Sequence, residues 1–135
     1  MSVPRLIAVG YDGSADSVAA LRWGAEIAST IGARLRIVHA VGLLEHAGLS
    51  GRCSPHEQAA TDVACRVGLD IAQVEWRVRD GEPAAVLRRE TLGDDAADLL
   101  VVGTRGAGAH GGGTLGSTSL DLAQTATVPV VVVAG

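Results

Sequence analysis

Residues 99–119 form the stretch LLVVGTRGAGAHGGGTLGSTS, which contains the clearest structural pattern in the chain. It begins with an unbroken apolar run, Leu99 to Val102, which is typical of a parallel strand covered by helices on both faces. Seven of the chain's 18 glycines then fall between positions 103 and 116. Ser117 or a neighbouring residue can cap a helix that covers Leu120 to Ala126. The stretch therefore predicts a strand, a glycine-rich loop and a helix, in that order.

Four other segments have the pattern of strands. Leu6 to Val9 and Val130 to Val133 are unbroken apolar runs like the first. Arg34 to Ala40 and Ala72 to Asp80 alternate polar with apolar residues, as strands nearer the edge of a sheet do. We therefore expect five strands in all.

Helical patterns separate these strands. The turn at residues 12–14 is followed by a segment of about 16 residues in which apolar side chains recur at helical spacing. Gly32 marks the end of this helix. Shorter patterns run from Glu57 to about Val67, and from Pro83 at a first helical turn to near Gly93. Because strands and helices alternate, the connections are right-handed crossovers. The sequence thus predicts a single α/β domain over residues 1–135, with a doubly wound, five-stranded parallel sheet of order 3-2-1-4-5 and helices on both faces.

The composition excludes several classes of function. A chain of 135 residues that is 47% hydrophobic can bury a core without disulfides or structural metal, and Cys53 and Cys65 show no metal-binding spacing. All 11 basic residues are Arg, which excludes a Walker A lysine and a Schiff-base lysine. A net charge of -4 and an aromatic content of 2% argue against nucleic-acid binding. The N-terminal apolar stretch is too short for a signal peptide or a membrane span, so we expect a cytoplasmic protein.

The predicted topology places a ligand site at one edge of the sheet. In doubly wound sheets, ligands bind at the carboxyl ends of the strands where the strand order reverses. That reversal lies between the first and fourth strands, whose ends carry Asp12-Gly13 and Gly103-Thr104-Arg105-Gly106. Glycines let backbone N–H groups approach an anion, and a helix that begins near Ser117 adds free donors and the positive end of its dipole. The sequence therefore predicts a phosphate-binding site here.

Individual side chains near this edge have more than one interpretation. Asp12 can accept a hydrogen bond from a purine amine or a ribose hydroxyl, because Ser14 can cap the first helix in its place. His39 lies within an apolar strand, where a structural core histidine is expected. His110 can either reach a terminal phosphate or be a solvated loop residue, and Arg105 can either balance phosphate charge or lie on the surface.

Two metal or cofactor interpretations are less favoured. A literal G-x-G-x-x-G occurs at residues 106–111, but no acidic residue follows about 20 positions later, as a dinucleotide site requires. The acidic group formed by Asp94, Asp95 and Asp98 is interpreted as a solvated connection between a helix and a strand, rather than as a metal site.

The glycine spacing resembles that of a known family. Gly103-x2-Gly106-x9-Gly116-Ser117 reproduces the G-x2-G-x9-G-[S/T] signature of the ATP-binding universal stress proteins. The resemblance extends to residues 9–14 (VGYDGS), 33–40 (ARLRIVHA) and 128–133 (VPVVVV), so it covers nearly the whole chain in order.

This resemblance implies a role for each matching residue. Asp12 would lie against adenine and ribose, and Ala40 would line the adenine pocket. Gly103 and Gly106 would lie under the ribose and phosphates. The phosphate chain, with Mg2+ or Mn2+, would be bound by Gly116, Ser117 and Ser119. The resemblance thus implies an ATP-binding stress-response module, with at most slow hydrolysis, that pairs as a homodimer through the strand Val128 to Val133.

Two other functions stay open at this stage. The family usually has basic and bulky apolar residues where this chain has Ala107 to Leu115, and such a glycine-rich loop loses more entropy when it becomes ordered. A member that binds no nucleotide and acts as a dimeric scaffold is therefore one alternative. The other is an adenylating enzyme of the PP-loop type, because residues 12–17 (DGSADS) partly match S-G-G-x-D-S.

Overall fold

The unbroken apolar runs form strands in one parallel sheet. The computed structural model describes residues 3–41, 55–104 and 115–134. The strand order is β3-β2-β1-β4-β5 and every pairing is parallel, so the predicted doubly wound topology is confirmed. The strands are β1 (Leu6–Gly10), β2 (Arg34–Val41), β3 (Val74–Asp80), β4 (Leu99–Gly103) and β5 (Val130–Val133).

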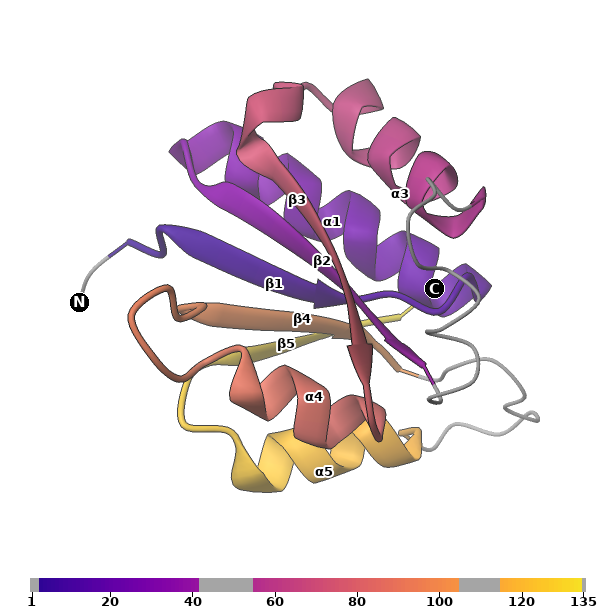
Figure 1. The fold of residues 1–135 in the computed structure, drawn as a ribbon, viewed down its shortest axis with the longest axis vertical. Helices are drawn as coiled ribbons and strands as arrows, with labels where there is room; N and C mark the ends of the chain where they lie inside the picture. Colours follow the sequence, from indigo (N-terminus) through magenta and orange to yellow (C-terminus); the bar gives the residue numbers. More distant parts are fainter. Residues whose placement is uncertain (1–2, 42–54, 105–114, 135) are drawn as a thin grey trace.

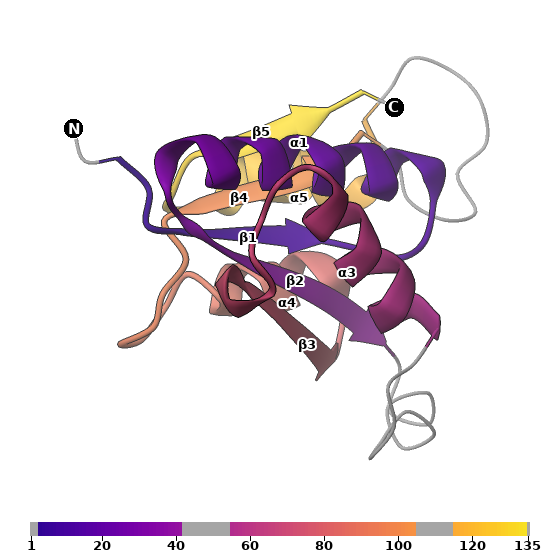
Figure 2. The ribbon, with the colours of Figure 1, turned by 90° about the horizontal axis from the view of Figure 1, so that it is seen from above.

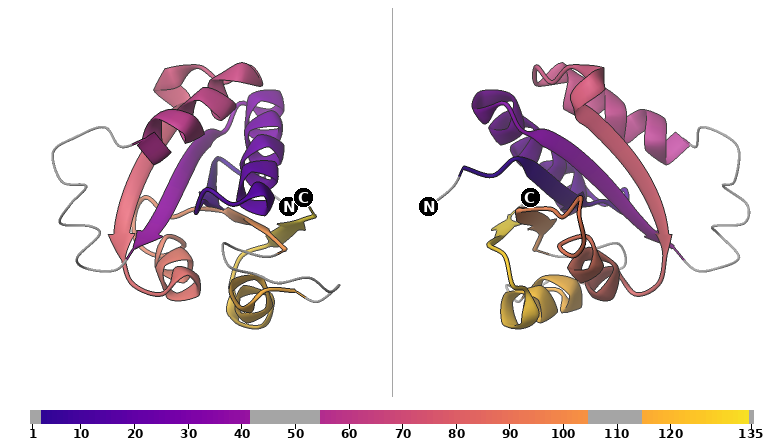
Figure 3. Two further views of the ribbon diagram at one scale, coloured as in Figure 1. Left: turned by 90° about the vertical axis from the view of Figure 1, so that its right-hand side faces the viewer. Right: turned by 60° about the vertical axis from the view of Figure 1, so that its left-hand side comes forward.

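Helices cover both faces of this sheet. Helices lie against each face, as Figure 1 and the turned views of Figure 3 show. Seen from above in Figure 2, the longest helix runs along the sheet, where it contacts β1 and β4. The first face carries α1 (Ala15–Ile31) and α3 (Pro55–Arg66), the second carries α4 (Pro83–Arg89) and α5 (Ser117–Thr125), and a short 3-10 turn, η1 (Ile71–Gln73), precedes β3.

Most predicted boundaries agree with the structure to within a few residues. The N-cap of α1 is Ser14, whose hydroxyl accepts the Ser17 N–H, and its C-cap is Gly32 with φ of 74°. That left-handed conformation is the one expected of a glycine at a helix end. The cap of α5 is Gly116, a neighbour of Ser117 as expected, but the helix begins at Ser117 rather than Leu120. The largest other differences are that α4 ends at Arg89 rather than near Gly93, and that residues 72–73 belong to η1 instead of β3.

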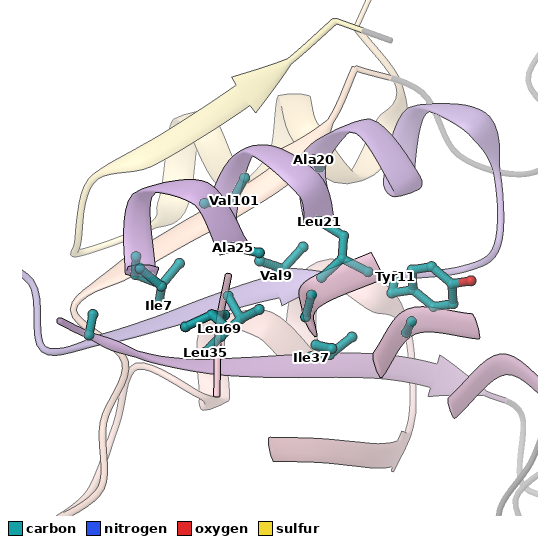
Figure 4. Close-up of a cluster of buried hydrophobic side chains, with 14 of the residues drawn as sticks. Ile7, Val9, Tyr11, Ala20, Leu21, Ala25, Leu35, Ile37, Leu69 and Val101 are labelled. Carbon is teal, nitrogen blue, oxygen red and sulfur yellow. The ribbon is translucent and has the colours of Figure 1, made fainter. Parts of the chain in front are cut away.

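The larger apolar cluster lies between the sheet and α1. Side chains of β1, β2 and β4 meet those of α1 there, and Tyr11 closes the cluster at the carboxyl end of β1 (Figure 4). A second cluster, which includes Val38, Leu87 and Leu100, lies between the sheet and α4 and α5. Both faces of the central strands are therefore buried, as their unbroken apolar runs indicate.

A buried arginine on β2 is the main feature that sequence patterns missed. Arg36 is fully buried, and its guanidinium donates to Glu75 at 3.0 Å and to the Asp95 carboxylate at 2.6 Å. It also lies 3.3 Å from Glu90, another buried group. Burial opposes the ionisation of Glu75, but hydrogen bonds from Arg36 and Arg77 outweigh it and lower the pKa of that carboxyl. Arg36 is therefore the centre of an ion-pair network in which Arg36 and Glu90 are buried and the other partners are partly exposed.

The predicted acidic connection is tied to the sheet. Hydrogen bonding to Arg34, together with the charges of Arg34 and Arg36, lowers the pKa of Asp95. The Asp98 carboxylate accepts hydrogen bonds from the backbone N–H groups of Arg5 and Leu6, at 2.8 and 3.1 Å. Both side chains thus fix how the strands begin. In the ranges that the structure describes, no three His, Cys, Asp or Glu side chains form a group that could hold a metal ion.

Candidate functional site

A cavity of about 570 Å³ opens at the carboxyl ends of the strands. Among the described residues, its walls come from the end of β1, the start of α1, the second half of β2, the start of α4, the end of β4 and the start of α5. This is the edge where the strand order reverses between β1 and β4. The cavity therefore lies where the topology predicts a ligand site. The sequence-predicted residues that line it are Asp12, Ala40, Gly103, Gly116, Ser117 and Ser119.

The β1 wall is fixed by a short set of hydrogen bonds. The Asp12 carboxylate accepts the Ser14 N–H at 2.9 Å, and the Ser17 hydroxyl accepts the Asp12 N–H at 3.3 Å. Ser14 caps α1 through its own hydroxyl, as the sequence predicts. Asp12 is thus positioned by the turn while it lines the cavity.

The β4 wall lies directly against the start of α1. A Cβ atom at Gly103 would lie 2.7 Å from the backbone carbon and oxygen of Asp16, closer than real Cβ contacts allow. Next to it, the Thr104 hydroxyl donates to the Asp16 carboxylate at 2.7 Å. Gly103 is therefore required for packing as well as for a smooth cavity wall, and the segments near residues 12 and 103 do converge.

The start of α5 is joined to the end of β4. The Thr104 carbonyl accepts the Gly116 N–H, and the Ser119 hydroxyl donates to the carbonyls of Thr104 and Gly116, both at 3.1 Å. Ser119 is only 1% exposed, so its hydroxyl holds the cavity wall together. The more exposed hydroxyls at this wall belong to Ser117 and Thr118.

The N-terminus of α5 can bind an anion. Its N-cap, Gly116, makes no side-chain capping bond, and the first turn contains no acidic residue. The first N–H groups of a helix have no partner within the helix, and they carry the positive end of its dipole. A phosphate in this part of the cavity would accept hydrogen bonds from these amides.

The charges of the cavity wall limit what it can hold. The described lining residues include two carboxylates, Asp12 and Glu82, and no arginine. Burial, followed by the charge of Asp12, raises the pKa of the Tyr11 hydroxyl. Attraction for a phosphate therefore comes from backbone amides in this part of the chain. Arg105, Gly106 and His110, which the sequence also places here, lie outside the described residues.

Two predictions about nearby side chains have different outcomes. His39 is a buried structural residue, as predicted, and its Nδ1 donates to the Tyr11 carbonyl at 2.9 Å. The sequence pattern at Pro83 predicts only the start of a helix. It does not show that Glu82, Pro83 and Leu87 line the cavity. The available signal was topological: the segment follows β3, so it emerges at the same edge of the parallel sheet as the other lining segments.

Comparison with known proteins gives one family. The sequence model of the universal stress protein family matches residues 5–134. A universal stress protein of Mycolicibacterium smegmatis is 35% identical over 145 residues, covering 96% of this chain and 48% of that protein, so the chain spans about half the length of this relative. A second relative is the universal stress protein in the QAH/OAS sulfhydrylase 3' region of Thermus aquaticus. It is 31% identical over 138 residues, which are 96% of this chain and 98% of that protein.

A solved structure extends this similarity to three dimensions. The crystal structure of a universal stress protein in complex with cAMP has a TM-score of 0.78 and 29% sequence identity to this chain. The similarity covers 98% of both chains.

Proposed function

Because the chain belongs to the universal stress protein family, we propose that it is a regulatory module that binds an adenine nucleotide, with ATP as its ligand. The observation that carries the proposal is the convergence of two segments about ninety residues apart in sequence. Thr104 donates to Asp16, and Gly116 donates to Thr104, so the turn after β1 and the start of α5 share one cavity.

The cavity has separate regions for the parts of a nucleotide. Val38, Ala40 and Leu87 line it with apolar surface suited to a purine. Asp12 supplies an acceptor suited to ribose hydroxyls. Gly103, Gly106 and Gly116 would lie beside the phosphates, together with the Ser117 hydroxyl and the amides of α5. Ser119, also expected at the phosphates, would support this wall through its bonds to the Thr104 and Gly116 carbonyls. The similar protein solved with cAMP supports the adenine part of this proposal.

The phosphate end is suited to a cation held mainly by the nucleotide. The donors on this wall are backbone amides and hydroxyl groups, which are suited to phosphate oxygens. When bound, Mg2+ or Mn2+ would neutralise phosphate charge. Fast phosphoryl transfer needs a group that orients the nucleophile, and the sequence offers no lysine and no obvious base for this role. Slow hydrolysis at most is therefore proposed, which fits a regulatory role.

Calorimetric titration of the purified chain tests this proposal. We expect saturable binding of ATP with Mg2+, and binding should be lost in Gly116→Val, because Gly116 lines the cavity at the start of α5. Gly32→Asn is a matched control, because Gly32 caps the far end of α1 and has no atom within 4 Å of an added Cβ. No binding by the unmodified chain would contradict the proposal and favour the nucleotide-free scaffold.

Two further measurements separate the remaining possibilities. Titration with cAMP compares a ligand of one phosphate charge with ATP, which matters because the described wall carries carboxylates and no arginine. Tighter binding of cAMP would indicate that cAMP, rather than ATP, is the ligand of this same cavity. An assay with ATP and a carboxylate substrate tests the adenylating alternative, for which an adenylated product would be decisive.

We also propose a homodimer that forms through the C-terminal strand. β5 is an edge strand, paired with β4 on one side, and its four valines are half-buried. An apolar edge strand of this kind is suited to pairing with another chain. Sedimentation equilibrium should give twice the 13.7 kDa chain mass at micromolar concentration. A species of 13.7 kDa alone would contradict it.

No described helix is long and apolar enough to cross a membrane, and a cytoplasmic location stays a prediction.

A further inference from the structure

Glu82 lines the cavity, and its carboxylate is suited to a hydrogen bond with a purine base. This inference rests on the proposed nucleotide function. The apolar region of the cavity is formed by Val38 and Ala40 from β2 and by Pro83 and Leu87 from α4. Glu82 directly precedes Pro83 and lines the same cavity, so a carboxylate stands beside the region that suits the base.

The orientation of this carboxylate is fixed by the helix that follows it. Glu82 is the N-cap of α4, and its two oxygens accept the N–H groups of Ala84 and Ala85, both at 3.2 Å. An ionised carboxylate has about four acceptor positions, and the two capping bonds occupy two of them. The capped side chain can therefore accept a further hydrogen bond without giving up its helix cap.

Neighbouring backbone acceptors are already engaged. The Val38 carbonyl accepts the Tyr11 N–H at 2.9 Å, and the Val41 carbonyl accepts the Gly81 N–H at 3.1 Å. The other carboxylate of the wall, Asp12, belongs to the β1 turn, where it accepts the Ser14 N–H. Of the two carboxylates among the described lining residues, Glu82 is the one that directly precedes the apolar lining residues of α4.

We propose that the Glu82 carboxylate accepts a hydrogen bond from the 6-amino group of the purine, and that it makes the site select adenine over 6-oxo purines. Adenine presents a donor at this position. Hypoxanthine presents an oxygen, which would face the carboxylate with neither group satisfied. Sites that read a substrate by a hydrogen bond discriminate strongly against analogues that cannot make it.

Competitive titration with ATP and inosine triphosphate tests this assignment, because the two nucleotides differ only in the 6-amino or 6-oxo group and in the N1 proton that accompanies the 6-oxo group. The unmodified chain should prefer ATP. In Glu82→Gln, the amide oxygen keeps an acceptor for the α4 cap while the NH2 group can donate to a 6-oxo purine. We expect the ratio of the two affinities to fall by about tenfold. Glu26→Gln, an exposed change on α1, removes the same charge and should leave the ratio unchanged.

A second variant keeps the test decisive if glutamine disturbs α4. Glu82→Ser retains a good helix cap but is too short to reach the base, so it should also lower the ratio. An unchanged ratio in a folded Glu82 variant would overturn the assignment. An equal gain in affinity for both nucleotides would overturn it too, because it would mean that Glu82 only repels phosphate. If the unmodified chain bound neither nucleotide, the proposed function itself would fail, which is a different result.

Discussion

Replacing Gly103 with alanine tests the contact that holds the cavity together. The added Cβ would lie 2.7 Å from backbone atoms of Asp16 and 2.8 Å from its Cβ, so the start of α1 would have to move away from β4. Backbone cannot yield as a flexible side chain does, and overpacking of this kind costs about 1–3 kcal/mol. We expect the free energy of unfolding, measured with urea, to fall by about that amount, and nucleotide affinity to fall with it.

Gly10→Ala is the matched control for this variant. Gly10 also lines the cavity at a strand end, but its added Cβ would meet the Leu87 side chain at 3.0 Å and the Val102 side chain at 3.5 Å. These side chains can shift, so the loss should stay below about 1 kcal/mol. Equal losses of stability in the two variants, or a Gly103→Ala protein as stable as the unmodified chain, would show that the contact between Gly103 and Asp16 does not limit packing.

Three further predictions concern the side chains that hold the fold and the cavity wall. Arg36→Leu should lower the free energy of unfolding by about 1–3 kcal/mol, because it removes the nearest cation of the buried Glu90 and leaves Arg77 and Arg79 at 3.5 Å. The double change with Glu90→Leu should recover part of this loss. The pKa values of Glu75 and Asp95 are lowered in the folded state, so their ionised forms stabilise it fully above the ordinary values of 4.5 and 3.8. The urea midpoint should therefore decrease as the pH falls below these values, and a constant midpoint from about pH 5 to about pH 3 would contradict this. Ser119→Ala should cost about 1 kcal/mol in thermal unfolding, because it removes the donor to two backbone carbonyls, and no loss would show that this bond is dispensable.

The topology could be predicted because burial on both faces leaves a direct mark on the sequence. Leu99 to Val102 has no polar residue, which only a central strand covered on both sides requires. Gly32 and Ser14 mark the ends of α1 by local backbone chemistry, and both act as predicted. These signals are local, so they can be read without knowing what lies opposite them.

Other features depend on partners that are distant in sequence. Arg36 looks like a solvent-facing residue of an alternating strand, because its partners Glu75 and Asp95 lie 39 and 59 positions away. Gly103 looks like part of a phosphate loop, whereas its contact with Asp16 adds a packing requirement that only the structure reveals. Glu82 was missed for the same reason, since only the sheet order brings it to the cavity.

A crystal structure of the chain grown with saturating ATP and Mg2+ would show whether nucleotide binds at this edge of the sheet. We expect the base against Ala40 and Leu87, with the phosphates at the N-terminus of α5. Nucleotide bound at any other surface, or a cavity that stays empty under those conditions, would contradict this expectation.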